Sequence, residues 1–339
     1  MSFSINQRFL VGKHESSPGV METPTEADFN VRIRNPEITP IIEWADDASK
    51  FANGGHGEDE DIAGAQSATI TFSVRLGIGD TISTNPNWVK YFNACGVKDN
   101  NYAGTGVGLQ PCPAYDNSTI TLWVYDVVTG HQGLTRATIY KFAGCCGNVV
   151  IGQEGVGKPM VATFTFTGKC MDVVDTNTVP DGMDFGTAHA EKALNQTLAF
   201  GANAQKVSSW SLDAGNEVQP LINQGDITGY DYYQITARKP RLTANPISQT
   251  VAAEPVWQRM ISGLTGTSAV FVTGIMLTGA NIGLRIPKAQ RVAANLGNRE
   301  GIVSWDSNWR LLSNGWTGAV GDPDLAPEVT WELLIGARS

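Results

Sequence analysis

Short runs of alternating apolar and polar residues, separated by clusters of glycine, proline, asparagine and aspartate, recur along the 339-residue chain and constrain its fold most. In Val161–Gly168 the side chains of Val161 and three threonines face one way, and Phe164 and Phe166 face the other. One packed face and one polar face are typical of strands in an antiparallel sheet or barrel. The sequence therefore predicts a mainly β protein.

Both halves of the chain contain such predicted strands. Those of the first half are Ile38–Trp44, Ser67–Leu76, Ser118–Val128, Ala137–Phe142, Asn148–Gly152 and Val161–Gly168. Those of the second half are Val207–Leu212, Tyr230–Arg238, Ala269–Thr278, Asn281–Ile286, Gly301–Leu311 and Glu328–Ile335. The segment Asp175–Gly186 between the two sets is polar and rich in turn residues, which predicts domains at residues 1–180 and 181–339.

Helical signals are few. Asn85–Gly96 is predicted to be a capped helix, because Pro86 suits an early helical position and a glycine suits the C-terminal stop. Trp88 and Phe92 then lie one turn apart on the same face. A second predicted helix is Ala188–Ala199.

An internal repeat is indicated by a proline placed two residues before a tryptophan at the start of a predicted helix. The matched marks are Pro86-x-Trp88 and Pro255-x-Trp257, the upstream strands Ile70–Arg75 and Tyr233–Arg238, and the downstream segments that begin at Ile139 and Ile286. We interpret them as two diverged copies of one β-sandwich or barrel, each with a flanking α-helix. The core anchors expected for these helices are Trp88, Phe92, Trp257 and Met260.

The charge of the chain is low and negative. Charged residues make up 17% of the chain, below the ~25% typical of soluble domains, and the formal net charge at pH 7 is −9. A sequence-reading nucleic-acid binder usually carries a basic face, since phosphate neutralisation dominates its affinity. The charge argues against that class, and the small number of charged residues suggests that some of the surface is covered by other copies.

Cysteine usage and hydropathy bear on the compartment. The five cysteines are Cys95, Cys112, Cys145, Cys146 and Cys170, an odd number that argues against a secreted disulfide framework. The N-terminus lacks an apolar core of signal-peptide length, and no run reaches the ~18 apolar residues of a membrane span. We expect a soluble intracellular protein with reduced thiols and no membrane partner.

No catalytic, cofactor-binding or metal-binding constellation emerges. Gly152–Pro159 is one residue short of a phosphate-binding P-loop, but Pro159 replaces the hydroxyl residue that would hold Mg²⁺, and a strand is predicted to follow. A glycine-rich turn is the better interpretation. The histidines are dispersed and no CxxC pair exists, so buried thiols are expected rather than a Cys-His or metal site. We expect no enzyme and no cofactor.

An acidic run interrupts the first half between Asn53 and the strand that follows. It consists of Glu58, Asp59, Glu60 and Asp61. The run lacks the alternating ligands and the loop glycine of a calcium-binding EF-hand. It is either a solvated hairpin tip or a docking loop that meets basic residues of a neighbouring subunit.

Several short segments follow one another in a distinctive order along the chain. They are Val20–Asp28, Phe92–Gly96, Ser118–Asp126, Leu134–Ala137, Gly144–Ile151 and Phe164–Gly168 in the first half, and Trp210–Glu217, Ile235–Pro240 and Ile286–Gln290 in the second. Their order resembles that of the tail tube (major tail) proteins of long-tailed bacteriophages. The resemblance spans most of the chain. Each motif is short and structural, so their order carries it.

The resemblance implies a β-barrel-like fold with a flanking helix, whose copies form rings that stack into a tube conducting DNA from capsid to host. A net-negative chain suits such a conduit, because acidic walls repel phosphates. The implied partners are the chain itself, the tape-measure protein and DNA in the lumen, and the tail terminator and distal tail proteins. The implied location is the virion tail, with assembly in the host cytoplasm, and a long non-contractile tail is preferred.

Two tube-like copies per chain have a geometric consequence. If the rings hold six tube domains, three chains close one ring with pseudo-sixfold symmetry. The alternative is six chains, with the second copy outside the tube. The loop Phe51–Gln66, with its acidic run, is then the expected contact between stacked rings, and the arm Met1–Thr25 is expected to pack on a neighbour. Small polar or acidic side chains on Ile38–Trp44 and Ser67–Leu76 are expected to face the lumen.

A competing interpretation is a non-enzymatic binding module, a two-domain β-sandwich that binds carbohydrate or decorates a capsid. The nine tryptophans would serve stacking on sugars. Trp88, Trp257, Trp305 and Trp309, however, fall where core packing explains them. Self-assembly into hollow filaments discriminates the tube protein from such a module.

Overall fold

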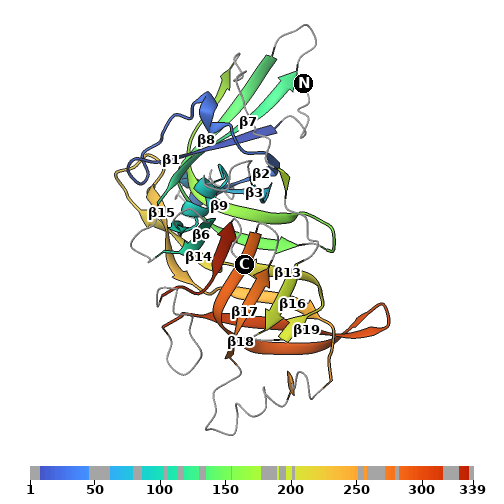
Figure 1. The fold of residues 1–339 in the computed structure, drawn as a ribbon. Coiled ribbons are helices and arrows are strands. Elements are labelled where there is room, and N and C mark those ends of the chain that lie inside the picture. The colour runs from blue at the N-terminus through green and yellow to red at the C-terminus, as the bar shows by residue number, and fades with distance from the viewer. Residues whose placement is uncertain are drawn as a thin grey trace, which may run out of the picture.

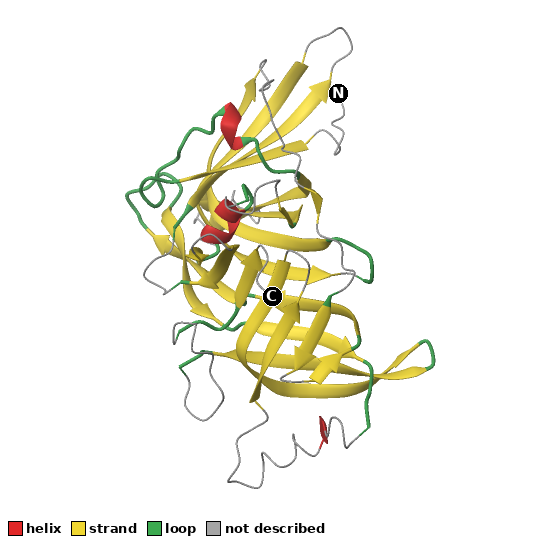
Figure 2. Ribbon diagram, viewed as in Figure 1, coloured by secondary structure: helices red, strands yellow, loops and turns green. Residues whose placement is uncertain are grey.

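The protein is mainly β, and its largest element is one antiparallel sheet (Figures 1 and 2). The computed structural model describes residues 8–45, 62–78, 86–102, 106–112, 118–129, 135–153, 155–176, 189–190, 196–200, 203–250, 256–257, 272–278, 282–315 and 328–335. Within these ranges, 16 strands belong to the large sheet, and two further pairs form small two-stranded sheets. The prediction of a mainly β protein is confirmed.

The elements follow one another along the chain in two sets, one for each half. In the first half they are β1 (Arg8–His14), η2 (Glu26–Asp28), β2 (Ile33–Ala45), β3 (Ile62–Arg75), β4 (Gly77–Ile78), α1 (Val89–Asn93), β5 (Val97–Tyr102), β6 (Gly106–Pro111), β7 (Ile120–Thr129), β8 (Thr135–Gln153) and β9 (Met160–Thr176). In the second half they are β10 (His189–Ala190), β11 (Thr197–Phe200), β12 (Asn203–Gln205), β13 (Val207–Asp213), β14 (Asn216–Ile222), β15 (Tyr230–Arg238), β16 (Arg241–Pro246), β17 (Val272–Thr278), β18 (Ile282–Arg299), β19 (Ile302–Leu312) and β20 (Glu332–Ile335).

Two regions of the large sheet have the same connectivity. In the first half the strands lie in the order β7-β8-β9-β3-β2, and in the second half in the order β17-β18-β19-β16-β13. Along the chain, the first region consists of the pair β2 and β3, a long connection, and the three consecutive antiparallel strands β7, β8 and β9. The second region consists in the same order of β13 and β16, a long connection, and β17, β18 and β19. By this correspondence β2 matches β13, β8 matches β18, and α1 and the helical pair Val256–Trp257 both lie in the long connection.

The two regions are joined edge to edge. The end of β8 pairs with β13, with Gln153 opposite Trp210 and Val150 opposite Asp213. A second link is β20, which pairs with β18 of the second half and with β6 of the first. In Figure 1 the first half lies toward the top of the molecule and the second half toward the bottom, with the red strand β20 between them.

The largest cluster of buried apolar residues lies on one face of this sheet, and two smaller buried clusters are separate from it. Alternate residues of β3 and β9, among them Phe72, Phe164 and Phe166, are almost completely buried. The same cluster continues into the second half through Leu212 and Trp309. Because burial of apolar area is the main favourable contribution to folding, this shared core ties the two halves energetically.

The first flanking helix expected from the sequence is reduced to one short turn, and of the second, expected to begin at Pro255-x-Trp257, only the helical pair Val256–Trp257 is described. Asn85–Gly96 forms only α1, a single short turn of helix, before Gly96 adopts φ +68° and β5 begins. The sequence predicts a helix over Ala188–Ala199, but the described residues of this segment lie in β10 and β11, which pair with β4 and β17. Pairing with the sheet outweighs the helix propensity of its alanine and leucine residues.

Several strands differ from their predicted form. Ala137–Phe142 and Asn148–Gly152 belong to one continuous strand, β8, and β18 runs on to Arg299. The polar segment from Lys98 onward, which is not among the predicted strands, forms the hairpin β5–β6. Tyr233–Arg238, interpreted above as the repeat of β3, instead lies in β15 of the separate hairpin β14–β15; by connectivity the counterpart of β3 is β16.

The described residues of the N-terminal arm pack on their own chain, and the packing of the arm on a neighbouring copy stays a prediction. β1 pairs with β7 along its whole length. The Glu15 carboxylate then accepts four hydrogen bonds, from the backbone N–H groups of Gly19 (2.8 Å) and Gly144 (2.7 Å) and from the hydroxyls of Thr119 (2.6 Å) and Thr121 (2.9 Å). This carboxylate fastens the turn after β1 to β7 and β8.

Candidate functional site: a polar sheet face across the junction

The face of the large sheet opposite the core carries small polar side chains. On β3 and β9 the residues that alternate with the buried phenylalanines are threonine or serine, and they form cross-strand pairs. The pairs are Thr69–Thr167, Thr71–Thr165 and Ser73–Thr163. Such Thr–Thr and Thr–Ser pairs stabilise a sheet and leave hydroxyl groups toward solvent. The alternation in Val161–Gly168 thus locates this face in the sequence.

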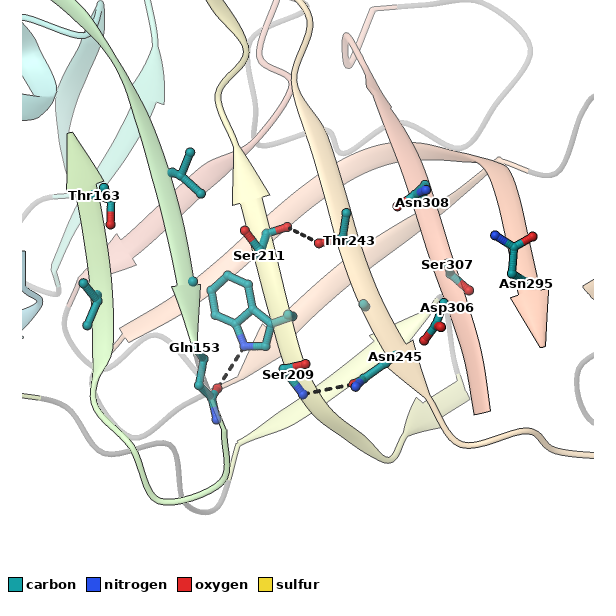
Figure 3. A pocket seen from close by; sticks show the side chains of 15 residues that line it. Gln153, Thr163, Ser209, Ser211, Thr243, Asn245, Asn295, Asp306, Ser307 and Asn308 are labelled. Atoms are coloured by element: carbon teal, nitrogen blue, oxygen red, sulfur yellow. Dashed lines mark hydrogen bonds between the residues drawn. The ribbon is translucent and has the colours of Figure 1, made fainter. Parts of the chain in front are cut away.

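The polar face continues across the junction into the second half and is hollowed there. The hollow has a volume of about 480 Å³. Its labelled lining side chains, seen from close by in Figure 3, are Gln153, Thr163, Ser209, Ser211, Thr243, Asn245, Asn295, Asp306, Ser307 and Asn308. They come from β8 and β9 of the first half and from β13, β16, β18 and β19 of the second.

The side chains on the second-half strands are held in place by hydrogen bonds to the backbone. Asn245 Oδ1 accepts from the backbone N–H groups of Ser208 (3.1 Å) and Ser209 (3.0 Å), and its Nδ2 donates to the Ser208 hydroxyl at 2.7 Å. These bonds span the register shift between Val207 and Trp210, where the ladder between β13 and β16 is interrupted. Asn245 therefore stabilises a β-bulge beside the hollow, which Ser209 and Asn245 line.

The junction itself is fastened by side chains from both halves. Trp210 is 3% exposed, and its Nε1 donates to Gln153 Oε1 at 3.0 Å, as Figure 3 shows. Farther along, Asn148 Nδ2 donates to Asp213 Oδ1 at 2.8 Å, and the backbone N–H of Asn216 donates to Asn148 Oδ1 at 3.0 Å. The two halves of the sheet thus meet in a fixed register.

The described charged side chains on this face are few, and the arginines among them outnumber the aspartates. Asp306 is the one titratable side chain among the described residues that line the hollow. The cross-strand pair Arg241–Arg310 and Arg75 lie at alternate positions on the same face, and Asp213 faces the same way. The excess negative charge of the chain is therefore not concentrated on the described area of the polar face.

The residues predicted for helix anchoring separate into two groups. Trp88 and Phe92 are buried in the core: the Trp88 indole N–H donates to the Gly77 carbonyl at 2.9 Å, and the ring of Phe92 lies 5.2 Å from that of Phe164. Trp257, expected in the core, is 53% exposed and lies 6.2 Å from the ring of Trp305. Met260 lies outside the described residues.

The acidic run also lies outside the described residues. Glu58, Asp59, Glu60 and Asp61 fall in the connection between β2 and β3, of which residues 46–61 are not described. Only the end of the predicted stacking loop is described, and it belongs to β3. The role of this loop stays a prediction.

The cysteines are poor candidates for nucleophiles. All five are free thiols, and four of them are buried. Burial raises the pKa of Cys146 to about 12 and raises the pKa values of Cys95 and Cys145, so these thiols are protonated at neutral pH. Within the described ranges, no group of three or more His, Cys, Asp and Glu side chains is arranged to hold a metal ion.

The glycine-rich segment after β8 forms a turn. Its described residues, Gly155–Lys158, lead directly into β9 and not into a helix. A phosphate would therefore find no helix N-terminus at this point.

No protein-family model matches the chain, and no curated protein matches its sequence. Among the residues that the structure describes, no helix is long and apolar enough to span a membrane. The polar face and the junction beneath it are thus the features from which a function is inferred.

Proposed function

We propose that this chain is a tail tube protein of a long-tailed bacteriophage, a structural protein without catalytic activity. Copies would form rings, and stacked rings would form the conduit through which DNA passes to the host. The observation that carries this proposal is the junction between β13 and β8, where one chain joins two regions of the same connectivity edge to edge. A ring requires the same kind of joint between chains.

The repeated connectivity supports two tube domains per chain, at residues 1–180 and 181–339. Each domain would be a β-sandwich or barrel formed around its five matched strands. Three chains would then supply six domains to one ring, and six chains with the second domain outside the tube are the alternative. We propose a non-contractile tail, with the tape-measure protein and DNA in the lumen and the terminator and distal tail proteins at the ends.

The polar face suits the wall of the conduit. Hydroxyl and amide groups keep a surface hydrated without binding phosphate through charge, whereas arginine and lysine side chains would retain DNA. The pairs Thr71–Thr165 and Ser73–Thr163 include residues of β3, where small polar lumen residues are expected from the sequence. We propose a wall in which hydroxyl and amide groups predominate over the three arginines and two aspartates described on the same face, within a chain of negative net charge.

Electron microscopy of the purified protein in negative stain, concentrated at neutral pH, tests the proposal. Hollow stacked rings are the expected result, and the mass of a ring relative to the chain decides between three and six copies. Filaments without a lumen would contradict a DNA conduit. Dispersed monomers would favour the second candidate function below.

The hollow favours one second candidate, a carbohydrate-binding module. Its lining of serine, threonine, asparagine and glutamine side chains offers the donors and acceptors that a sugar requires. Its tryptophan, Trp210, is 3% exposed and engaged with Gln153, so it presents little ring surface for stacking. Binding of a glycan library to the monomer, lost on Asn308→Ala, would support this candidate.

A further inference from the structure

One edge of β2 is open. β2 pairs with β3 along one edge, and no described strand pairs with the other. The Arg8 guanidinium donates to the Pro36 carbonyl at 3.0 Å, so the open section begins after that residue. Trp44 is 58% exposed and Ile42 41% exposed on this segment. A long edge with exposed apolar side chains is prone to pair with another strand.

A second edge without a described partner strand lies on β18. β17 pairs with β18 only as far as Gln290, while β19 occupies the opposite edge as far as Arg299. The segment 292–299 therefore has a single described neighbour. Val292 is 47% exposed and Leu296 60% exposed. This edge, like that of β2, combines a strand edge that no described strand covers with exposed apolar side chains.

The chain itself contains a joint between the counterparts of these two edges. β13, the counterpart of β2, pairs antiparallel with residues 150–153 of β8, the counterpart of β18. These residues of β8 come after Cys145, where the pairing of β8 with β7 ends. In the same way, the segment 292–299 of β18 comes after Gln290, where the described pairing of β18 with β17 ends. The joint needs only four paired residues on each strand.

We propose that residues 37–45 of one copy pair antiparallel with residues 292–299 of a second copy. This joint repeats between chains the β13–β8 joint within a chain, and it rests on the proposed ring. Pro40 has no N–H to donate to the ladder, so a long run of paired residues through this position is disfavoured. A short joint like the internal one, with four paired residues on each strand, avoids this cost. Ile42, Trp44, Val292 and Leu296 become covered, and each chain offers one edge of each kind. The contact is heterologous, so repetition closes a ring when the rotation is right.

Charge substitutions on the two edges test this joint. Trp44→Glu and Leu296→Lys each place a charge in the proposed contact, and each is expected to reduce the assembled fraction at least tenfold by sedimentation velocity. The double variant, Trp44→Glu with Leu296→Lys, brings opposite charges together in every joint and is expected to recover assembly. Ile227→Lys is the matched control, since Ile227 is 96% exposed and lies on neither edge.

The outcomes separate this joint from the ring itself. Both single variants must unfold at the wild-type urea midpoint, so that lost assembly reports the edge and not the fold. If the wild type forms rings and both single variants also form them, the joint proposed here is wrong and the tube function stands. If the wild type remains monomeric at every concentration, both the proposed function and the proposed joint are wrong.

Discussion

The Trp210 indole N–H donates to the Gln153 side-chain carbonyl across 3.0 Å, and this bond joins a residue of the second half to one of the first. The two residues are also directly opposite each other in the ladder between β13 and β8. The backbone pairing and the side-chain bond therefore fix the same register. Because Trp210 is 3% exposed, its N–H has little access to water if the acceptor is removed.

Gln153→Leu is accordingly expected to destabilise the protein by about 1–3 kcal/mol, the cost of a buried donor left without a partner. In the Trp210→Phe background the same substitution is expected to cost much less, because no indole N–H remains to be paired. Urea unfolding of the four proteins in this double-mutant cycle measures the coupling. Equal costs in both backgrounds would mean that the bond does not hold the junction.

Glu15 is expected to be the most sensitive polar residue of the N-terminal arm. Glu15→Ala removes the acceptor for two backbone N–H groups and two hydroxyls, and a loss of about 3 kcal/mol or more is expected. Glu15→Gln provides a matched control: the threonine hydroxyls can turn to accept from its amide, whereas a glycine N–H facing that amide cannot. An intermediate urea midpoint is therefore expected for the glutamine variant, and equal midpoints for the two variants would contradict the network.

The contribution of the buried Lys90 ammonium group to the free energy of unfolding is expected to increase in mild alkali. Burial lowers its pKa to about 8, and Nζ donates to the Asp28 carbonyl at 2.7 Å. Between pH 8 and the unfolded pKa near 10.5, the unfolded chain binds more protons at this residue than the folded chain, so the contribution of Lys90 to stability increases with pH. The expected gain from pH 8 to 10 is about 2 kcal/mol, reduced by any residual hydration.

Lys90→Met isolates that effect, because the other titrating groups remain. The free energy of unfolding is measured by urea titration at pH 8, 9 and 10 for wild type and variant. The value for the wild type is expected to increase relative to that of the variant as the pH rises. Burial raises the pKa of Tyr125 to about 12 and also raises the pKa values of Cys95, Cys145 and Cys146, so these groups oppose stability from about pH 9 upward. Their contributions are the same in wild type and variant and cancel in the difference, and the comparison stops at pH 10. A difference that is constant with pH would show that Lys90 is protonated in the folded protein over this range.

The sequence predicted the strands whose two faces differ. Alternation in Val161–Gly168 identified both the phenylalanine core and the threonine face, because burial follows directly from a period of two. It missed β16, a six-residue strand that ends at Pro246, and β14, which contains Pro220. These strands are specified by the neighbours they pair with, which local propensity does not encode.

The hollow and the junction were beyond sequence reasoning for a related reason. Gln153 and Trp210 are 57 residues apart, and only the tertiary pairing of β8 with β13 brings them together. The helix predictions failed for a different reason. Trp88 and Phe92 pack as their helical spacing predicts, but the helix that carries them spans only Val89–Asn93, because a left-handed glycine and then β5 follow.

Lysine on the polar face tests whether that face lines the conduit. Thr163 and Thr165 lie at alternate positions of β9 on this face, and Thr165 is exposed. In assembled tubes, Thr163→Lys with Thr165→Lys would line the wall with cations that contact phosphates, whereas the wild-type wall offers hydroxyls. We expect the variant tubes to retain at least about tenfold more nuclease-protected duplex DNA in about 50 mM salt, and most of it to be released in about 200 mM salt.

Val20→Lys, at a residue that is 54% exposed and outside the sheet, is the control for added charge elsewhere. Its tubes are expected to protect no more DNA than wild-type tubes, because DNA on an outer surface stays open to nuclease. Equal protection by the control and the wall variant would place Thr163 and Thr165 outside the lumen. Since those threonines share a face with the hollow, that result would also mean that the hollow lies outside the channel. It would then favour a role of the hollow in binding an external ligand.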